Sequence, residues 1–310
     1  MMERGKYLVF ALLAVLLISG CVQQGTTTGS GIVINTFEPA LKSVESGEEV
    51  SLHLEVQNTG DYTDAPVVAE LTGIDLSEWN VIDRYKNLGS LLAPDKDAGT
   101  EGGRAGVDWR ITAPSLRRGQ RLTYEPIARV YYLYKTIATK PVWFVTTEEL
   151  KKIVRVGGTL ESEPTTVTAG PLNVEIKTGR FVRSTDWRDT KFQLQIHIEN
   201  IGNGYVAGKD YPLFIEVKWP NGVAPVGECP TITYEAAGEL YKDVPASLTR
   251  PSFGRVVKLW NGRDVDLTCE FRIIEPPTNK EKRNFEVEIG YIYYVDAKTS
   301  IEVVGTEEFL

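Results

Sequence analysis

Residues 50–58 read VSLHLEVQN, and residues 192–200 read FQLQIHIEN. In both stretches an apolar residue occupies every second position, and polar residues, including His53 and His197, lie between them. Strict alternation with a period of two is typical of a β-strand that buries only one face. The two stretches therefore predict half-buried strands whose histidines face outward into solvent.

The two predicted strands belong to an internal repeat. Each ends in a similar turn, Asn58-Thr59-Gly60 or Asn200-Ile201-Gly202, at an offset of 142 residues. Three further blocks recur in the same order: GIVINTF from Gly31 with NVEIKTG from Asn173 (offset 142), Trp109–Pro114 with Phe271–Pro276 (offset 162), and Arg129–Thr139 with Ile289–Thr299 (offset 160). The last alignment matches Tyr131 with Tyr291 and Tyr134 with Tyr294. Conserved order with loop-sized changes in offset indicates a tandem duplication.

The repeat predicts an all-β fold. Each unit, residues 31–170 and residues 171–310, has about seven or eight short strands separated by turn residues. This pattern favours two tandem β-sandwiches, with a closed barrel as the alternative. One short helix is expected near residues 147–154, where Thr146 or Thr147 precedes acidic and then basic residues.

The first twenty residues have the plan of a signal peptide. Arg4 and Lys6 precede the apolar run 7–19, which is too short for an ordinary transmembrane helix. Residues 17–21 (LISGC) resemble the lipobox of prokaryotic lipoproteins, which implies cleavage after residue 20 and lipidation of Cys21. Residues 21–30 then form a flexible, polar tether. An uncleaved anchor helix, or an ordinary signal with a chance cysteine, is the alternative.

The alternating strand that ends in an N-x-G turn resembles immunoglobulin-like sandwich modules of archaeal and bacterial envelope proteins, including cell-adhesion-related domains. The resemblance implies a non-catalytic lipoprotein on the extracellular face of the cell membrane. Its expected partners are the membrane, through Cys21, and another envelope or extracellular protein, in adhesion or in assembly of an envelope complex. An extracellular carbohydrate-binding or carbohydrate-processing lipoprotein is the alternative.

The remaining cysteines, Cys229 and Cys269, form an even pair. An oxidising exterior permits a disulfide between them. Two buried free thiols are the alternative. Cys269 lies in the run VDLTCEFRI, whose alternation predicts that its sulfur faces the core.

Charge and motifs exclude several functional classes. The 310 residues include 34 Lys and Arg against 42 Asp and Glu, and a net charge of −8 makes nucleic acid an unexpected partner. The chain has two histidines and no nucleophile elbow, zinc-protease or phosphate-loop motif. We therefore expect no enzyme activity, no cofactor and no metal site.

Aromatic residues are the candidates for a binding surface. Tyr132, Tyr134 and Tyr293 lie on strands where they either fill the core or form an exposed aromatic strip. Trp219 and Trp260 lie in residues 203–268, the segment in which the two units differ most. That segment is either a recognition surface for protein or glycan, or an elaborated strand connection.

Overall fold

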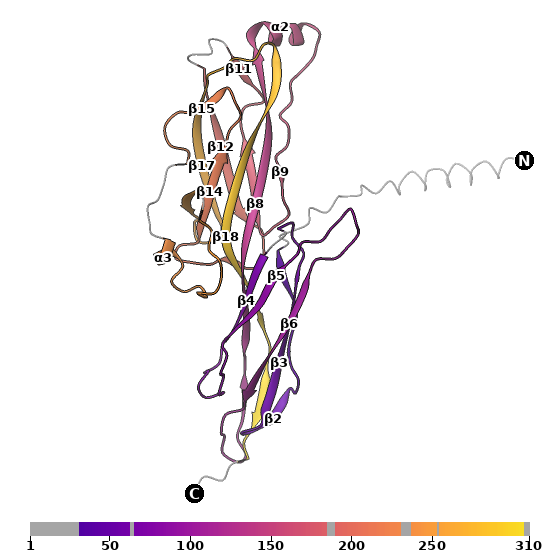
Figure 1. Ribbon diagram of the computed structural model, residues 1–310, viewed down its shortest axis with the longest axis vertical. Helices are drawn as coiled ribbons and strands as arrows, with labels where there is room; N and C mark the ends of the chain where they lie inside the picture. Colours follow the sequence, from indigo (N-terminus) through magenta and orange to yellow (C-terminus); the bar gives the residue numbers. More distant parts are fainter. Residues whose placement is uncertain (1–30, 63–64, 185–189, 231–236, 253, 307–310) are drawn as a thin grey trace, which may run out of the picture.

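The computed structural model describes residues 31–62, 65–184, 190–230, 237–252 and 254–306 (Figure 1). The predicted signal peptide, the tether and Cys21 lie outside these residues. Within the described ranges, no helix is long and apolar enough to span a membrane.

The strands form four sheets and confirm the prediction of an all-β sandwich fold. One sheet contains β1 (Ile32–Pro39), β3 (Glu49–Asn58) and β6 (Arg104–Thr112). A second contains β10 (Leu172–Lys177), β12 (Lys191–Asn200), β17 (Asp264–Ile273) and β15 (Val223–Pro225). A small third sheet contains β2 (Ser43–Glu45), β19 (Ile301–Val304) and β7 (Arg121–Tyr124).

The largest sheet has nine strands and extends through the whole molecule. Its main path is β16 (Arg255–Lys258), β14 (Pro212–Lys218), β18 (Lys280–Lys298), β8 (Ile127–Thr146), β4 (Ala65–Thr72) and β5 (Tyr85–Leu91). Three short strands pair beside this path: β9 (Thr166–Val167), β11 (Val182–Ser184) and β13 (Tyr205–Val206). The sheet of β1, β3 and β6 forms the first sandwich with one half of this large sheet, and the sheet of β10, β12, β17 and β15 forms the second sandwich with the other half (Figure 1).

Strands β8 and β18 connect the two sandwiches. They pair antiparallel along their entire length, from Ile127 opposite Lys298 to Val145 opposite Lys280. Strand β4 pairs with the start of β8, whereas β11 pairs with its end, so β8 contributes to both sandwiches. The predicted units 31–170 and 171–310 therefore divide the sequence but do not divide the sheets.

Strand β19 (Ile301–Val304) also belongs to the first sandwich, although it lies near the end of the sequence. After β18 crosses into the first sandwich, β19 pairs there with β2 in parallel and with β7 antiparallel. The last described strand of the chain thus completes the sandwich that contains the first one. The two sandwiches are interlocked by their own strands.

Strand pairing corrects two of the repeat offsets. Ile32 and Leu172 pair with the equivalent residues Asn58 and Asn200, so the first strands begin at an offset of 140 residues and not 142. A register shift between Ile34 and Thr36 changes this offset to 139 farther along the strands. Trp109 pairs with Leu52 as Cys269 pairs with Leu194, which gives 160 and not 162. The sequence matches were displaced because neighbouring positions on one strand face carry similar apolar residues.

The predicted alignment of the tyrosines was wrong by one residue. Tyr134 accepts a hydrogen bond from the backbone N–H of Tyr62, and Tyr293 accepts the same bond from Gly204. Tyr134 is therefore equivalent to Tyr293, at an offset of 159, and not to Tyr294. A slip of one residue moves a side chain to the opposite face of a strand, and Tyr294 packs with the cluster outside the core.

Apolar residues cover one face of the large sheet and part of the other. Tyr132, Tyr134, Tyr291 and Tyr293 belong to the core between the sheets. On the outer face, a second apolar cluster contains Val68, Tyr131, Ala207, Phe214, Leu240, Tyr241, Val244, Leu248 and Ile292. Part of segment 203–268, including the short helix α3 (Ala237–Leu240), thus covers this sheet and has a structural role.

The predicted helix is present as α2 (Thr147–Arg155) at one tip of the molecule (Figure 1). Thr146 caps its start by accepting a hydrogen bond from Glu149 N at 3.3 Å. None of its residues is buried, so the helix projects from the tip and does not fill the core.

The predicted disulfide is confirmed. Cys229 and Cys269 are bonded, with Cα atoms 5.2 Å apart, which rules out two free thiols. Cys269 is buried and faces the core, as the alternation predicted. Because Trp109 is its counterpart, the second sandwich has a disulfide where the first has a buried tryptophan.

Candidate functional site

The main candidate site is a pocket beside the tip that carries α2. It lies where β10 ends, the chain turns through Thr178 and Gly179, and β11 begins opposite the start of β12. Thr178 Oγ1 donates a hydrogen bond to Gly179 O at 2.7 Å inside this turn. The cavity has a volume of about 470 Å³.

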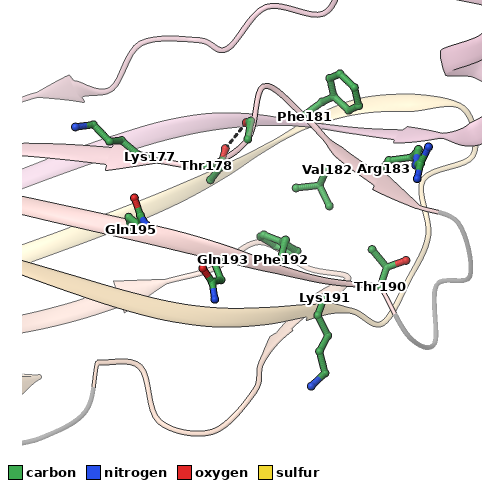
Figure 2. Close-up of a pocket in the computed structure, with 11 residues that line it drawn as sticks. Lys177, Thr178, Phe181, Val182, Arg183, Thr190, Lys191, Phe192, Gln193 and Gln195 are labelled. Carbon is green, nitrogen blue, oxygen red and sulfur yellow. Dashed lines mark hydrogen bonds between the residues drawn. The ribbon is translucent and has the colours of Figure 1, made fainter.

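An apolar floor and a cationic rim define the pocket. Val182 from β11 and Phe192 from β12 lie at its centre, and Gln193 and Gln195 follow along β12 (Figure 2). The Phe192 ring packs against the rings of Phe144, Phe271 and Phe285 in the core, at centroid distances of 5.6, 5.8 and 6.1 Å. The floor is therefore fixed by the core and does not depend on the turn.

Three cationic side chains surround this floor: Lys177, Arg183 and Lys191. Lys177 forms an ion pair with Glu175 at 2.9 Å, and Lys191 approaches Glu270 at 3.5 Å. Among the described residues, Arg183 has no acidic partner. A local cluster of cations on a chain with a net charge of −8 favours an anionic ligand over a neutral one.

The predicted aromatic surface is only partly available. Tyr132, Tyr134 and Tyr293 are buried, so for these three the core interpretation is correct and the exposed-strip interpretation is wrong. Burial raises the pKa of each phenol, to about 12 for Tyr293. Trp219 and Trp260 are 43% and 76% exposed, and binding at these rings stays a prediction.

The two histidines lie in similar surroundings on the two outer sheet faces. His53 lies between Glu38 on β1 and Asp108 on β6, and its Nδ1 is 2.9 Å from Asp108 Oδ1. His197 lies in the same way between Glu175 on β10 and Asp266 on β17, with the same 2.9 Å separation from Asp266. Both histidines are accessible to solvent, as the sequence predicted.

Beside the pair of His197 and Asp266, the structure places a third possible ligand, the Asp264 carboxylate, which the sequence analysis missed. Ligand atoms of His197, Asp264 and Asp266 all lie within 4.8 Å of one another. The sequence predicted no metal site because the chain has only two histidines and no metal-binding motif. The signal was present in the alternation, since Asp264 and Asp266 share the outward face of a strand that pairs with β12.

Sequence reasoning also missed the pocket. Its cations come from two strand ends and the short strand β11, and only the antiparallel return of β12 brings Lys191 beside Arg183. No motif marks such a set. The only indication in the sequence was that Lys177, Arg183 and Lys191 lie within fifteen residues of one another in an acidic chain.

The chain has little similarity to known proteins. No protein-family model and no curated protein matches the chain. Among solved structures, it is similar to the C-terminal globular domain of an oligosaccharyltransferase from Pyrococcus abyssi, with 12% identity and a TM-score of 0.21 over 90% of this chain and 50% of that one. The chain therefore spans half the length of that domain.

Two adhesins show weaker similarity. The Enterococcus faecalis MSCRAMM ACE has 9% identity and a TM-score of 0.15 over 88% of this chain and 95% of its own. A collagen adhesin from S. aureus has 9% identity and a TM-score of 0.12 over 87% and 91% of the two chains. With TM-scores this low, the assignment of two β-sandwiches depends on the strand pairings and the core.

Proposed function

We propose that the protein is a lipid-anchored component of the cell envelope that binds an anionic partner at the pocket of Lys177, Arg183 and Lys191. The observation that supports this proposal is the cationic rim over a rigid apolar floor. A binding protein needs a surface whose geometry is fixed before the partner arrives, because preorganisation lowers the entropic cost of association. The packed phenylalanines supply that rigidity.

The position of the first described residues supports a role in which the pocket is held away from the membrane anchor. The backbone carbonyl of Gly31 accepts a hydrogen bond from Thr59 N at 2.8 Å, and a Cβ at Gly31 would meet the Tyr132 hydroxyl. The chain thus enters at the waist, where β8 and β18 pass from one sandwich to the other. Twelve residues of β8 separate Tyr132 from Phe144 beside the pocket, or about 40 Å at strand spacing.

The anchoring part is tested by the substitution Cys21→Ser. We expect the wild-type protein to fractionate with membranes and to have the mass of a diacylated mature chain, and the variant to be soluble or unprocessed. Two acyl chains give stable anchoring because each buried methylene contributes about 0.8 kcal/mol. A soluble mature wild-type protein without a lipid mass would overturn this part of the proposal.

The pocket is tested by reversing its charge. The double variant Arg183→Glu, Lys191→Glu should lose the envelope component that wild-type protein retains in pull-downs from detergent extracts, and the loss should be at least about tenfold in retained amount, since like charges across an interface are costly. Lys42→Glu, an exposed cation in the first sandwich, is the matched control and should retain the partner. Equal retention by the double variant would refute binding at the pocket.

Glycan binding is the second candidate function, and the exposure of Trp260 favours it. A ring that is 76% exposed offers an apolar face for stacking against a sugar. Specific binding on a glycan array that is lost in Trp260→Ala but kept in the pocket double variant would support this candidate over the first. Hydrolysis of a bound glycan, lost on replacing a single acidic residue, would instead support the carbohydrate-processing form.

A further inference from the structure

The outer face of β10, β12 and β17 concentrates negative charge around His197. Cross-strand pairing places Glu175, His197 and Asp266 in one row across the three strands. The next row contains Asn173, Glu199 and Asp264. Within the part of the chain that the structure describes, neither Glu199 nor Asp264 has a basic partner, and Glu175 pairs with Lys177.

Three of these side chains converge. The ligand atoms of His197, Asp264 and Asp266 lie within 4.8 Å of one another, and the His197 and Asp266 atoms are 2.9 Å apart. In a tetrahedral zinc site with bonds of 2.0–2.2 Å, neighbouring ligand atoms are roughly 3.4 Å apart. Small changes of side-chain rotamer would bring the three groups to that spacing.

The first sandwich provides a natural comparison. His53 and Asp108 have the same 2.9 Å separation on the same kind of outer face. Two residues before Asp108 on its strand stands Gly106, whereas two residues before Asp266 stands Asp264. Arg104, in the first sandwich, also pairs with Glu55 and so neutralises that face. The first sandwich thus has two of the three groups and less negative charge.

We propose that His197, Asp264 and Asp266 form a binding site for a divalent transition-metal ion such as zinc. The imidazole nitrogen and one oxygen from each carboxylate supply three ligands, and water completes the coordination. A mixed set of nitrogen and oxygen ligands that includes imidazole favours zinc or a similar ion over calcium, which takes oxygen ligands. The site lies on the outer face of the second sandwich, beside the exposed Trp260, whose backbone N–H donates to Asp264 O at 2.7 Å.

Isothermal titration calorimetry of the purified protein with zinc chloride at neutral pH tests the site. We expect one zinc per chain, bound more tightly than calcium, with an affinity that falls at least about tenfold in both His197→Gln and Asp264→Asn. His53→Gln removes the histidine that pairs with Asp108 on the outer face of the first sandwich and should leave the titration unchanged. Zinc should also raise the melting temperature of the wild type but not that of His197→Gln.

Three results would each overturn the assignment. They are the absence of saturable zinc binding by the wild type, wild-type affinity in Asp264→Asn or His197→Gln, and weaker binding in His53→Gln. Circular dichroism establishes that each variant is folded before it is titrated. Because the three side chains are accessible to solvent, either second-sandwich variant is sufficient if the other does not fold.

Discussion

At the scale of single residues, buried tyrosines hold the waist of the molecule together. The rings of Tyr132, Tyr134, Tyr291 and Tyr293 contact one another across β8 and β18, with centroids 5.7 to 6.3 Å apart. Their hydroxyl groups also have partners. Tyr134 donates to Ala169 O at 2.6 Å, and Tyr291 and Thr136 share a hydrogen bond of 2.8 Å. Each tyrosine thus provides apolar area and a satisfied polar group in the same place.

Tyr293 provides the sharpest test of this cluster. Its hydroxyl donates to Asn200 Oδ1 at 2.7 Å and accepts from Gly204 N at 3.0 Å. Replacing Tyr293 with Phe leaves both partners without that oxygen in a buried place, so the free energy of unfolding should fall by about 1–3 kcal/mol. Tyr205→Phe, at a ring that is 51% exposed, should change it by less than about 0.5 kcal/mol. Chemical denaturation measures both, and equal effects would contradict the proposed role of Tyr293.

The same burial predicts a loss of stability at alkaline pH. Desolvation raises the pKa of Tyr131 and of Tyr293 to about 12, above the value near 10 of an unfolded tyrosine. Because the folded state favours the neutral phenol, the stabilising contribution is complete below about pH 10 and is lost as the pH rises toward 12.

Denaturant unfolding at a series of pH values should show this decline. The Tyr293→Phe variant should have a weaker pH dependence than the wild type. A free energy of unfolding that stays constant up to pH 12 would be inconsistent with buried phenols at the waist.

At the residue scale, the sequence predicted which face of each half-buried strand is inward. It could not align Tyr131 to Tyr134 with their counterparts, because tyrosines on both faces of β18 allow two alignments that differ by one residue. Only the shared hydrogen bonds of Tyr134 and Tyr293 distinguish them. Because apolar or aromatic side chains are buried on both faces of β8 and β18, the alternation of apolar and polar residues does not show which alignment is correct.

At the scale of elements, the second sandwich differs from the first by its disulfide. Cys269 occupies the position of Trp109 and connects β17 to Cys229, which follows the short strand β15. Arg255 on β16 adds a hydrogen bond to Pro230 O at 2.8 Å. These contacts attach β15 and the residues up to Pro230 to the core. The sheet of β1, β3 and β6 has no strand equivalent to β15.

Reduction of the disulfide should therefore loosen one region first. On the chain-entropy model, closing the 40-residue separation stabilises the fold by about 4 kcal/mol. We expect faster hydrogen exchange after reduction in residues 223–230 and 254–258, and unchanged exchange in β3 and β6. Thiol counting by mass spectrometry should find Cys229 and Cys269 unreactive in the unreduced protein. Two readily alkylated thiols, or uniform loosening of both sandwiches, would contradict this interpretation.

The sequence predicted the disulfide, the helix α2 and the strands, because each depends on local pattern or on cysteine count. It predicted neither the pocket nor the group around His197. Those depend on which strands become neighbours, as when β12 returns antiparallel beside β10 and β17. Alternation defines the face of a strand but does not identify its partner.

At the scale of the whole molecule, the chain forms two interlocked sandwiches. Strands β8 and β18 pair over 19 residue pairs, and β19 then returns to β2, near the start of the described chain. Each sandwich therefore includes strands from both halves of the sequence. The sequence could not predict this arrangement, because two separate tandem sandwiches would satisfy the same alternation and the same repeat.

Interlocking supports the proposed role of the protein. A pocket near one tip can be displayed away from the waist only if the two sandwiches do not bend freely against each other. The continuous strands provide that stiffness, since bending would break the ladder between β8 and β18. If the chain is anchored to the membrane through the residues before Gly31, the pocket would thus be held at a fixed position relative to the point of attachment.

The most direct test of the interlocked fold is a crosslink between the two ends of the chain. Glu302 on β19 is the strand partner of Ser43 on β2, and their side chains form a hydrogen bond of 3.1 Å. In a Cys21→Ser background, the pair Ser43→Cys and Glu302→Cys should be joined within one molecule by a short bis-maleimide. The control pair Lys177→Cys and Glu302→Cys, at opposite ends of the molecule, should not be joined. Absence of the first crosslink in folded protein, or its formation only between molecules, would contradict the interlocked fold.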